Sequence, residues 1–118
     1  LPGSAKMTET AYNILLKLAP TINRVPNKIS ISGHTDSAPL QNNNDYTNWD
    51  LSADRANEAR RALEEGGLAP PKIARVVGLA DMVMYDKKDP ESPMNRRISI
   101  TILNKQTERE IIKPTVIF

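Results

Sequence analysis

The 118-residue chain contains no cysteine, one histidine and five aromatic residues (one Trp, three Tyr and one Phe). Without cysteine it has no disulfides and no thiolate metal ligands. A zinc site takes three or more protein ligands, and a lone His34 does not supply them. The scarcity of aromatic residues leaves no stacking platform for nucleobases. We therefore expect neither a metal site nor a bound cofactor.

The chain also has little net charge and no long apolar run. Its 16 Lys and Arg residues and 14 Asp and Glu residues are interleaved, so no basic face for nucleic acid is expected. No run of about 18 apolar residues is long enough to span a membrane, and no signal peptide is visible. Because the chain begins Leu-Pro-Gly-Ser, we expect a fragment of a longer protein, with residues 1–4 a cloning remnant or an N-terminal linker.

What is present suits a single globular domain with an aliphatic core. Residues 6–23 place apolar side chains three and four positions apart, which predicts an amphipathic helix. Ser4 or Thr8 is the expected cap, and Pro20 should kink the helix or begin a new turn. The stripe consists of Met7, Ala11, Ile14, Leu15, Leu18 and Ile22.

Two stretches, residues 28–34 and 97–103, have the alternation of strands, and residues 73–78 are expected to form a further short strand. In the first, the isoleucines should face the core, while Ser30, Ser32 and His34 should face water. In the second, Ile98, Ile100 and Ile102 should face the core, which places Arg96 on the helix face. A short helix is expected over residues 105–112.

A second helix is predicted over residues 48–65, with Thr47 and Asp50 forming a capping box. One face collects small and apolar side chains, together with Asn48 and Arg55. The opposite face is charged and includes an expected Arg61–Glu65 pair. The order of elements predicts an α/β two-layer sandwich of the α+β type, a mixed β-sheet with helices packed on one face.

Four polar side chains are expected to converge: Asp36 at a strand end, Asn48 and Arg55 on the helix, and Arg96 before the last strand. A helix that packs back over the preceding strand brings its first turns beside that strand's end. Together the groups complement a ligand that carries an ammonium and a carboxylate close together. A structural Asp36–Arg55 salt bridge is the alternative interpretation, and the two are compatible.

His34 and the nearby serines do not predict an enzyme. A nucleophilic Ser30, Ser32 or Ser37 would need a base and an oxyanion hole, and no G-x-S-x-G sequence is present. We expect His34 to form local hydrogen bonds at the end of its strand, and we expect no catalytic residues.

Several motifs resemble the OmpA-like peptidoglycan-binding domain over about residues 5–105, with residues 106–118 left as a helix and tail. They are Gly33-His34-Thr35-Asp36, Asn48-x-x-Leu51-Ser52-x-x-Arg55-Ala56, Val76-Val77-Gly78 and Asn95-Arg96-Arg97-Ile98. The resemblance implies a βαβαβ-type fold in which Asp36 and Arg55 hold the ammonium and carboxylate of diaminopimelate in the wall peptide. It adds Asn48, Arg96, Thr35 and Leu51 to the same pocket.

Longer stretches, residues 46–57, 75–78, 95–99 and 103–106, are most similar to the MotB branch, the flagellar stator proteins. That similarity implies a periplasmic domain of a bacterial inner-membrane protein. It further implies a homodimer that anchors the stator to peptidoglycan and meets the channel subunit MotA through an N-terminal region absent here. Ser37-Ala38-Pro39 departs from the general family pattern, so the rim of the pocket should differ. The alternatives are a wall anchor of an outer-membrane porin or lipoprotein and, more remotely, a wall-modifying enzyme.

Overall fold

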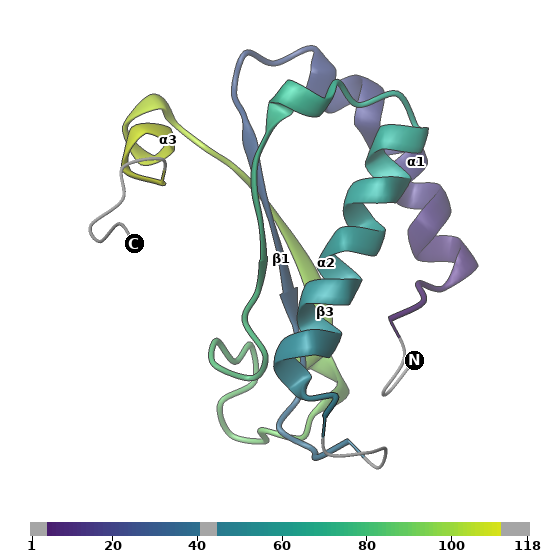
Figure 1. The fold of residues 1–118 in the computed structure, drawn as a ribbon, viewed down its shortest axis with the longest axis vertical. Coiled ribbons are helices and arrows are strands. Elements are labelled where there is room, and N and C mark those ends of the chain that lie inside the picture. Colours follow the sequence, from purple (N-terminus) through teal and green to yellow (C-terminus); the bar gives the residue numbers. More distant parts are fainter. Residues whose placement is uncertain (1–4, 41–44, 112–118) are drawn as a thin grey trace.

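The computed structural model describes residues 5–40 and 45–111, and within them the predicted order of helices and strands is present (Figure 1). Short 3-10 turns cover Pro70–Lys72 and Pro93–Asn95. Residues 1–4, 41–44 and 112–118 lie outside this description, and so do the expectations for Ser4 and the C-terminal tail. The main elements are α1 (Glu9–Asn23), β1 (Ile29–His34), α2 (Asn48–Glu65), β2 (Ile73–Gly78), β3 (Arg97–Ile102) and α3 (Lys105–Ile111).

The strands of the described chain form one mixed sheet in the order β2-β1-β3. β1 runs parallel to β2 and antiparallel to β3, so that Ile31 pairs with Val76 on one side and Ile100 on the other. The α2 helix makes the crossover between the two parallel strands, and α1 packs beside α2 (Figure 1). The predicted α/β two-layer sandwich with a mixed sheet is therefore confirmed.

The core lies between this sheet and the two long helices. Ile98 and Ile100 pack against it as predicted, but Ile102 and Ile14 are more than half exposed, at 57% and 59%. Ile102 ends an outer strand of the described sheet, which explains its exposure. The buried hydrophobic cluster comprises Leu15, Ala19, Ile22, Ile29, Ile31, Ala56, Ala59, Ala62, Leu63 and Leu68.

α1 begins at Glu9, later than predicted, because the Thr8 hydroxyl accepts a hydrogen bond from the Ala11 backbone N–H at 3.2 Å and caps the helix. The helix runs through Pro20 to Asn23, so the predicted new turn is wrong. Proline provides no N–H for the carbonyl four residues earlier, that of Leu16. Gly66 lies against that carbonyl, where an added Cβ would stand 2.4 Å from the oxygen.

The face of β1 turned away from the helices is buried, contrary to the prediction that it faces water. Ser30, Ser32 and His34 are 2%, 9% and 3% exposed. β1 is the central strand, so side chains of both neighbours cover it. Arg75 on β2 donates from Nε to the Ser30 hydroxyl at 3.0 Å, and Arg97 on β3 pairs in register with His34.

The backbone of α2 packs directly against the sheet because two glycines lie beneath its second turn. Gly33 and Gly78 are paired across β1 and β2. A Cβ on Gly33 would stand 2.0 Å from the Ser52 carbonyl oxygen, and one on Gly78 would stand 2.5 Å from the Ala53 nitrogen. The Ser52 hydroxyl also accepts a hydrogen bond from the Ala80 N–H at 3.0 Å. These contacts fix the start of α2 against the strand ends.

The surface of α2 follows the sequence prediction with one change. The Thr47–Asp50 capping box is present, and the buried face contains the predicted small and apolar residues together with Arg55. On the charged face, Arg61 pairs with Glu58 at 2.6 Å and not with Glu65. Either partner lies within one turn of Arg61, so spacing alone does not choose between them.

Candidate ligand-binding site at the end of β1

Asp36 is the acidic centre of the site and lies two residues beyond β1, where it is only 7% exposed. Its Oδ2 accepts a hydrogen bond from Arg96 Nη1 at 2.6 Å, and its Oδ1 accepts one from the Ala38 backbone N–H at 3.0 Å. The Asp36–Arg96 ion pair joins the end of β1 to the residue before β3. The carboxylate is thereby fixed in orientation before any ligand arrives.

Arg55 reaches the same neighbourhood from the buried face of α2 and is 8% exposed. Burial lowers the pKa of its guanidinium, the charge of Arg96 lowers that pKa further, and the charge of Asp36 raises it. The three groups therefore act on one another electrostatically, as the sequence predicts. Among the described residues, however, Asp36 forms its ion pair with Arg96. The alternative interpretation, a salt bridge from Asp36 to Arg55, is therefore not what the structure has at this carboxylate.

The other predicted site residues surround the charged groups in different ways. The Asn48 side chain donates to the carbonyls of Asp36 and Ala38 at 3.4 and 3.3 Å, which holds the turn after β1 against the start of α2. Thr35 is buried, and its hydroxyl has no hydrogen-bond partner among the described residues. Leu51 is 2% exposed, so it contributes by packing and not by an open contact.

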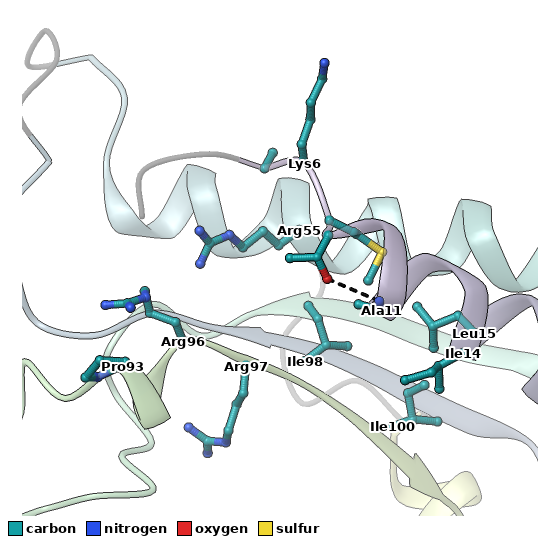
Figure 2. Close-up of a pocket in the computed structure, with 13 residues that line it drawn as sticks. Lys6, Ala11, Ile14, Leu15, Arg55, Pro93, Arg96, Arg97, Ile98 and Ile100 are labelled. Carbon is teal, nitrogen blue, oxygen red and sulfur yellow. Dashed lines mark hydrogen bonds between the residues drawn. The ribbon is translucent and has the colours of Figure 1, made fainter. Parts of the chain in front are cut away.

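A cavity of about 450 Å³ adjoins the two arginines (Figure 2). Arg55, Arg96, Arg97 and Lys6 contribute to its lining, and no described acidic residue does. Its apolar wall comes from α1 and β3 and includes Ala11, Ile14, Leu15, Ile98 and Ile100. With Arg55 and Arg96 in its lining and no described acidic residue there, the cavity favours an anionic group in a ligand.

His34 is buried beside the site without forming the predicted local network. Its Nδ1 has no hydrogen-bond partner in the part of the chain that is described. Burial lowers its pKa, and the positive charge of Arg97 adds to that effect. Within residues 5–40 and 45–111, no three His, Asp or Glu side chains gather as metal ligands.

Asn95 enters the sequence analysis only as the first residue of a family motif and without a role, whereas the structure places it next to the cluster and buries it completely. It lies in an irregular connection, where the apolar residues show neither the two-residue period of a strand nor the 3.6-residue period of a helix that would mark a buried position. The carbonyl of Pro90, in the same connection, accepts a hydrogen bond from the Ser37 N–H at 2.9 Å. The 79–95 connection is therefore attached to the turn that carries Asp36.

Residues 1–97 match the OmpA family. The chain belongs to that family. This member is 47% identical over 111 residues to Motility protein B of Escherichia coli strain K12, a match that covers 93% of this chain and 36% of the relative. The chain thus spans about a third of that relative's length. The resemblance to OmpA-like domains, and to MotB in particular, is confirmed.

Solved structures of OmpA-like domains share the fold. The C-terminal domain of Helicobacter pylori MotB superposes with a TM-score of 0.76 at 19% identity, covering 92% of this chain and 88% of that one. The peptidoglycan-associated lipoprotein of Burkholderia pseudomallei gives a TM-score of 0.67 at 24% identity, covering 86% and 84%. In the described residues, none of the helices has the length and apolar character needed to cross a bilayer.

Proposed function

We propose that this OmpA-family domain binds bacterial peptidoglycan noncovalently, through the diaminopimelate of the wall peptide. The observation that carries the proposal is the ion pair of the buried Asp36 with the partly exposed Arg96, with the buried Arg55 beside it, at the strand end of an OmpA-family chain. The free end of diaminopimelate has an ammonium and a carboxylate on one carbon atom. One carboxylate and two guanidinium groups complement those charges in sign.

On binding, the Asp36–Arg96 ion pair would be replaced by ion pairs between the ligand and Asp36, Arg55 and Arg96. The ligand ammonium approaches the Asp36 carboxylate, while the ligand carboxylate accepts hydrogen bonds from the guanidinium of Arg55 and from that of Arg96. Each charge-assisted hydrogen bond contributes about 1.5–3 kcal/mol before the loss of the Asp36–Arg96 contact is subtracted. Because Asn48 already holds the backbone of the turn, little ordering is left for the ligand to supply.

The biological role proposed is anchoring of a flagellar stator to the cell wall. It is supported by the 47% identity to Motility protein B of E. coli over most of this chain. In this role the domain lies in the periplasm, belongs to a homodimer of an inner-membrane protein, and works with the channel subunit MotA through a region outside this sequence. The domain acts by binding and carries no catalysis.

The second candidate is a wall anchor for an outer-membrane porin or lipoprotein. The similarity of fold to a peptidoglycan-associated lipoprotein favours it, although at 24% identity that similarity concerns the fold alone. Both candidates use the same ligand site. The gene upstream of residue 1 separates them, because a membrane helix that contains one aspartate supports the stator and a lipid-attachment signal or barrel supports the alternative.

The site is tested by Asp36→Ala and Arg55→Ala in co-sedimentation with purified sacculi. Each variant should bind at least about tenfold more weakly, because about 1.4 kcal/mol or more of charge pairing is lost. Glu58→Ala and Arg61→Ala make the same changes of charge on the exposed face of α2 and should pellet like the parent. Circular dichroism checks that the variants are folded.

A folded Asp36→Ala variant that pellets like the parent would contradict the site. In cells that lack the related stator protein, the same two substitutions should impair swimming when placed in the full-length chain. Release of soluble fragments from sacculi by the parent domain would contradict a role in binding alone and favour the wall-modifying enzyme.

A further inference from the structure

The side chain of Asn95 makes an extensive set of hydrogen bonds, and its exposed fraction is 0%. Its Oδ1 accepts hydrogen bonds from the backbone N–H groups of Tyr85 and Asp86, both at 2.8 Å. Its Nδ2 faces the carbonyl oxygens of Asp86, Asp89 and Pro90, each at 3.2 Å. One side chain thus holds the stretch 85–90 of the connection between β2 and β3.

Only a primary amide of this size satisfies that arrangement. The amide oxygen meets two donors, and the NH₂ group, which has two hydrogens, is shared among three acceptors. A carboxylate at the same place would face three carbonyl oxygens with no hydrogen to donate. An apolar side chain would leave buried backbone groups without partners, which is unfavourable for each group.

Asn95 is linked to the charged cluster at two points. The first is Arg96, the next residue, whose guanidinium meets the Asp36 carboxylate at 2.6 Å. The second is the Pro90 carbonyl, which receives the Asn95 amide and also the Ser37 N–H at 2.9 Å. Asn95 is therefore connected to Arg96 directly through the backbone, and to Ser37, the residue after Asp36, through the Pro90 carbonyl that both bind.

We propose that Asn95 is a positioning residue for the ligand site: it sets the Arg96 guanidinium against Asp36 and so determines the affinity for a ligand that bears an ammonium and a carboxylate. It does so without touching the ligand. The consequence for affinity rests on the function proposed above, whereas the effect on the ion pair does not.

The isosteric change Asn95→Asp tests this role against a matched control, Asn57→Asp. Asn57 lies on α2, and its Nδ2 donates a hydrogen bond to the Ala53 carbonyl at 3.2 Å. We expect Asn95→Asp to weaken binding of a diaminopimelate-containing peptide by about tenfold or more, measured by NMR titration. The control should stay within about twofold of the parent.

A double-mutant cycle separates positioning from a general loss of stability. In an Arg96→Ala background, Asn95→Asp should weaken peptide binding by less than about twofold further. The reason is that Asn95 acts on the ligand only through the Arg96 guanidinium, which that background lacks. The accompanying fall in Tm should be similar in both backgrounds. An equal factor of lost affinity in both backgrounds would overturn the proposal.

The ligand-free protein gives an independent test. NMR signals of the Arg96 guanidinium should report its ion pair with Asp36 in the parent and in Asn57→Asp, and should lose it in Asn95→Asp. Retention of the pair in folded Asn95→Asp would also overturn the proposal. If the parent fails to bind the peptide, the proposed function fails, while this measurement still decides the role of Asn95.

Discussion

At the scale of single residues, the site depends on charges that are held apart from water. Asp36 and Arg55 are each less than a tenth exposed, so their interactions with a ligand are weakly screened. Arg96 is more open, which leaves it able to exchange Asp36 for a ligand carboxylate. The arrangement has one more positive than negative charge, and this favours a ligand that brings a carboxylate.

The sequence predicts part of this cluster for a physical reason. Asp36 follows an alternating strand, and Arg55 stands on an apolar helix face where a cation needs a partner. The pairing of Asp36 with Arg96 is not predictable in the same way, since it depends on the path of the 79–95 connection. That path is fixed by the hydrogen bonds of Asn95, which no periodic pattern reveals.

His34 makes stability depend on pH. Burial and the charge of Arg97 lower its pKa in the folded chain below the ordinary value of 6.5, so the folded state favours the neutral ring. Above pH 6.5 this contribution is fully present. As the pH falls from 6.5 toward the lower folded pKa, the unfolded chain takes up the proton first and the free energy of unfolding decreases.

We therefore expect His34→Gln to flatten the loss of stability between pH 7 and pH 5, measured by urea unfolding at each pH. Between pH 7 and pH 9 the substitution should leave the slope of stability against pH unchanged, which serves as the internal control. A variant whose stability falls between pH 7 and 5 as steeply as that of the parent would show that His34 is not the group responsible.

At the scale of elements, the helix α2 brings the site together because the sheet beneath it lacks side chains at Gly33 and Gly78. The small residues of the helix are visible in the sequence, and they predict a close approach. The two glycines lie opposite each other under Ser52 because of the parallel register of β1 and β2. The sequence does not specify that register.

Gly33→Ala should displace the first turns of α2. Its Cβ would meet the Ser52 carbonyl oxygen at 2.0 Å, and overpacking of this kind costs about 1–3 kcal/mol. Because Asn48 and Arg55 move with the helix, binding to sacculi should fall together with the free energy of unfolding. Urea unfolding and co-sedimentation measure the two effects.

Gly67→Ala is the matched control for that prediction. Gly67 has a φ of +100°, and nothing lies within 4 Å of the position that an added methyl group would take, so the cost, about 1 kcal/mol, comes from the backbone alone. The substitution should lower stability while binding stays as in the parent. Parent-like binding by Gly33→Ala would mean that the position of α2 does not limit ligand affinity.

At the scale of the whole molecule, the site occupies one end of the sheet and α3 lies at the other (Figure 1). The described residues of one domain present one candidate ligand site, so several such sites require several copies. In a proposed homodimer, the second contact with the same wall would form at a high effective concentration. Attachment can then be firm while each single contact remains exchangeable.

Two copies joined by a flexible linker should accordingly bind sacculi with an apparent affinity at least about 100-fold above that of one domain. The control is the same linked pair with Asp36→Ala in one copy, which should lose at least about tenfold of that apparent affinity, because the weakened site gains less from the same effective concentration. Pelleting over a range of protein concentrations gives both values. Equal binding by the intact pair and the control would contradict anchoring through two sites.

The position of residues 5–8 beside the two arginines has a mechanical consequence. Lys6, Met7 and Thr8 line the same cavity as Arg55 and Arg96, so the segment that leads into α1 lies next to the ligand cluster. If the domain were pulled between that segment and a ligand on Asp36, both points at which the force acts would lie at the same end of the sheet. The strand ladder farther away and α3 would carry almost none of it. A domain that binds its ligand in the proposed way should therefore release it under load before its sheet is pulled apart.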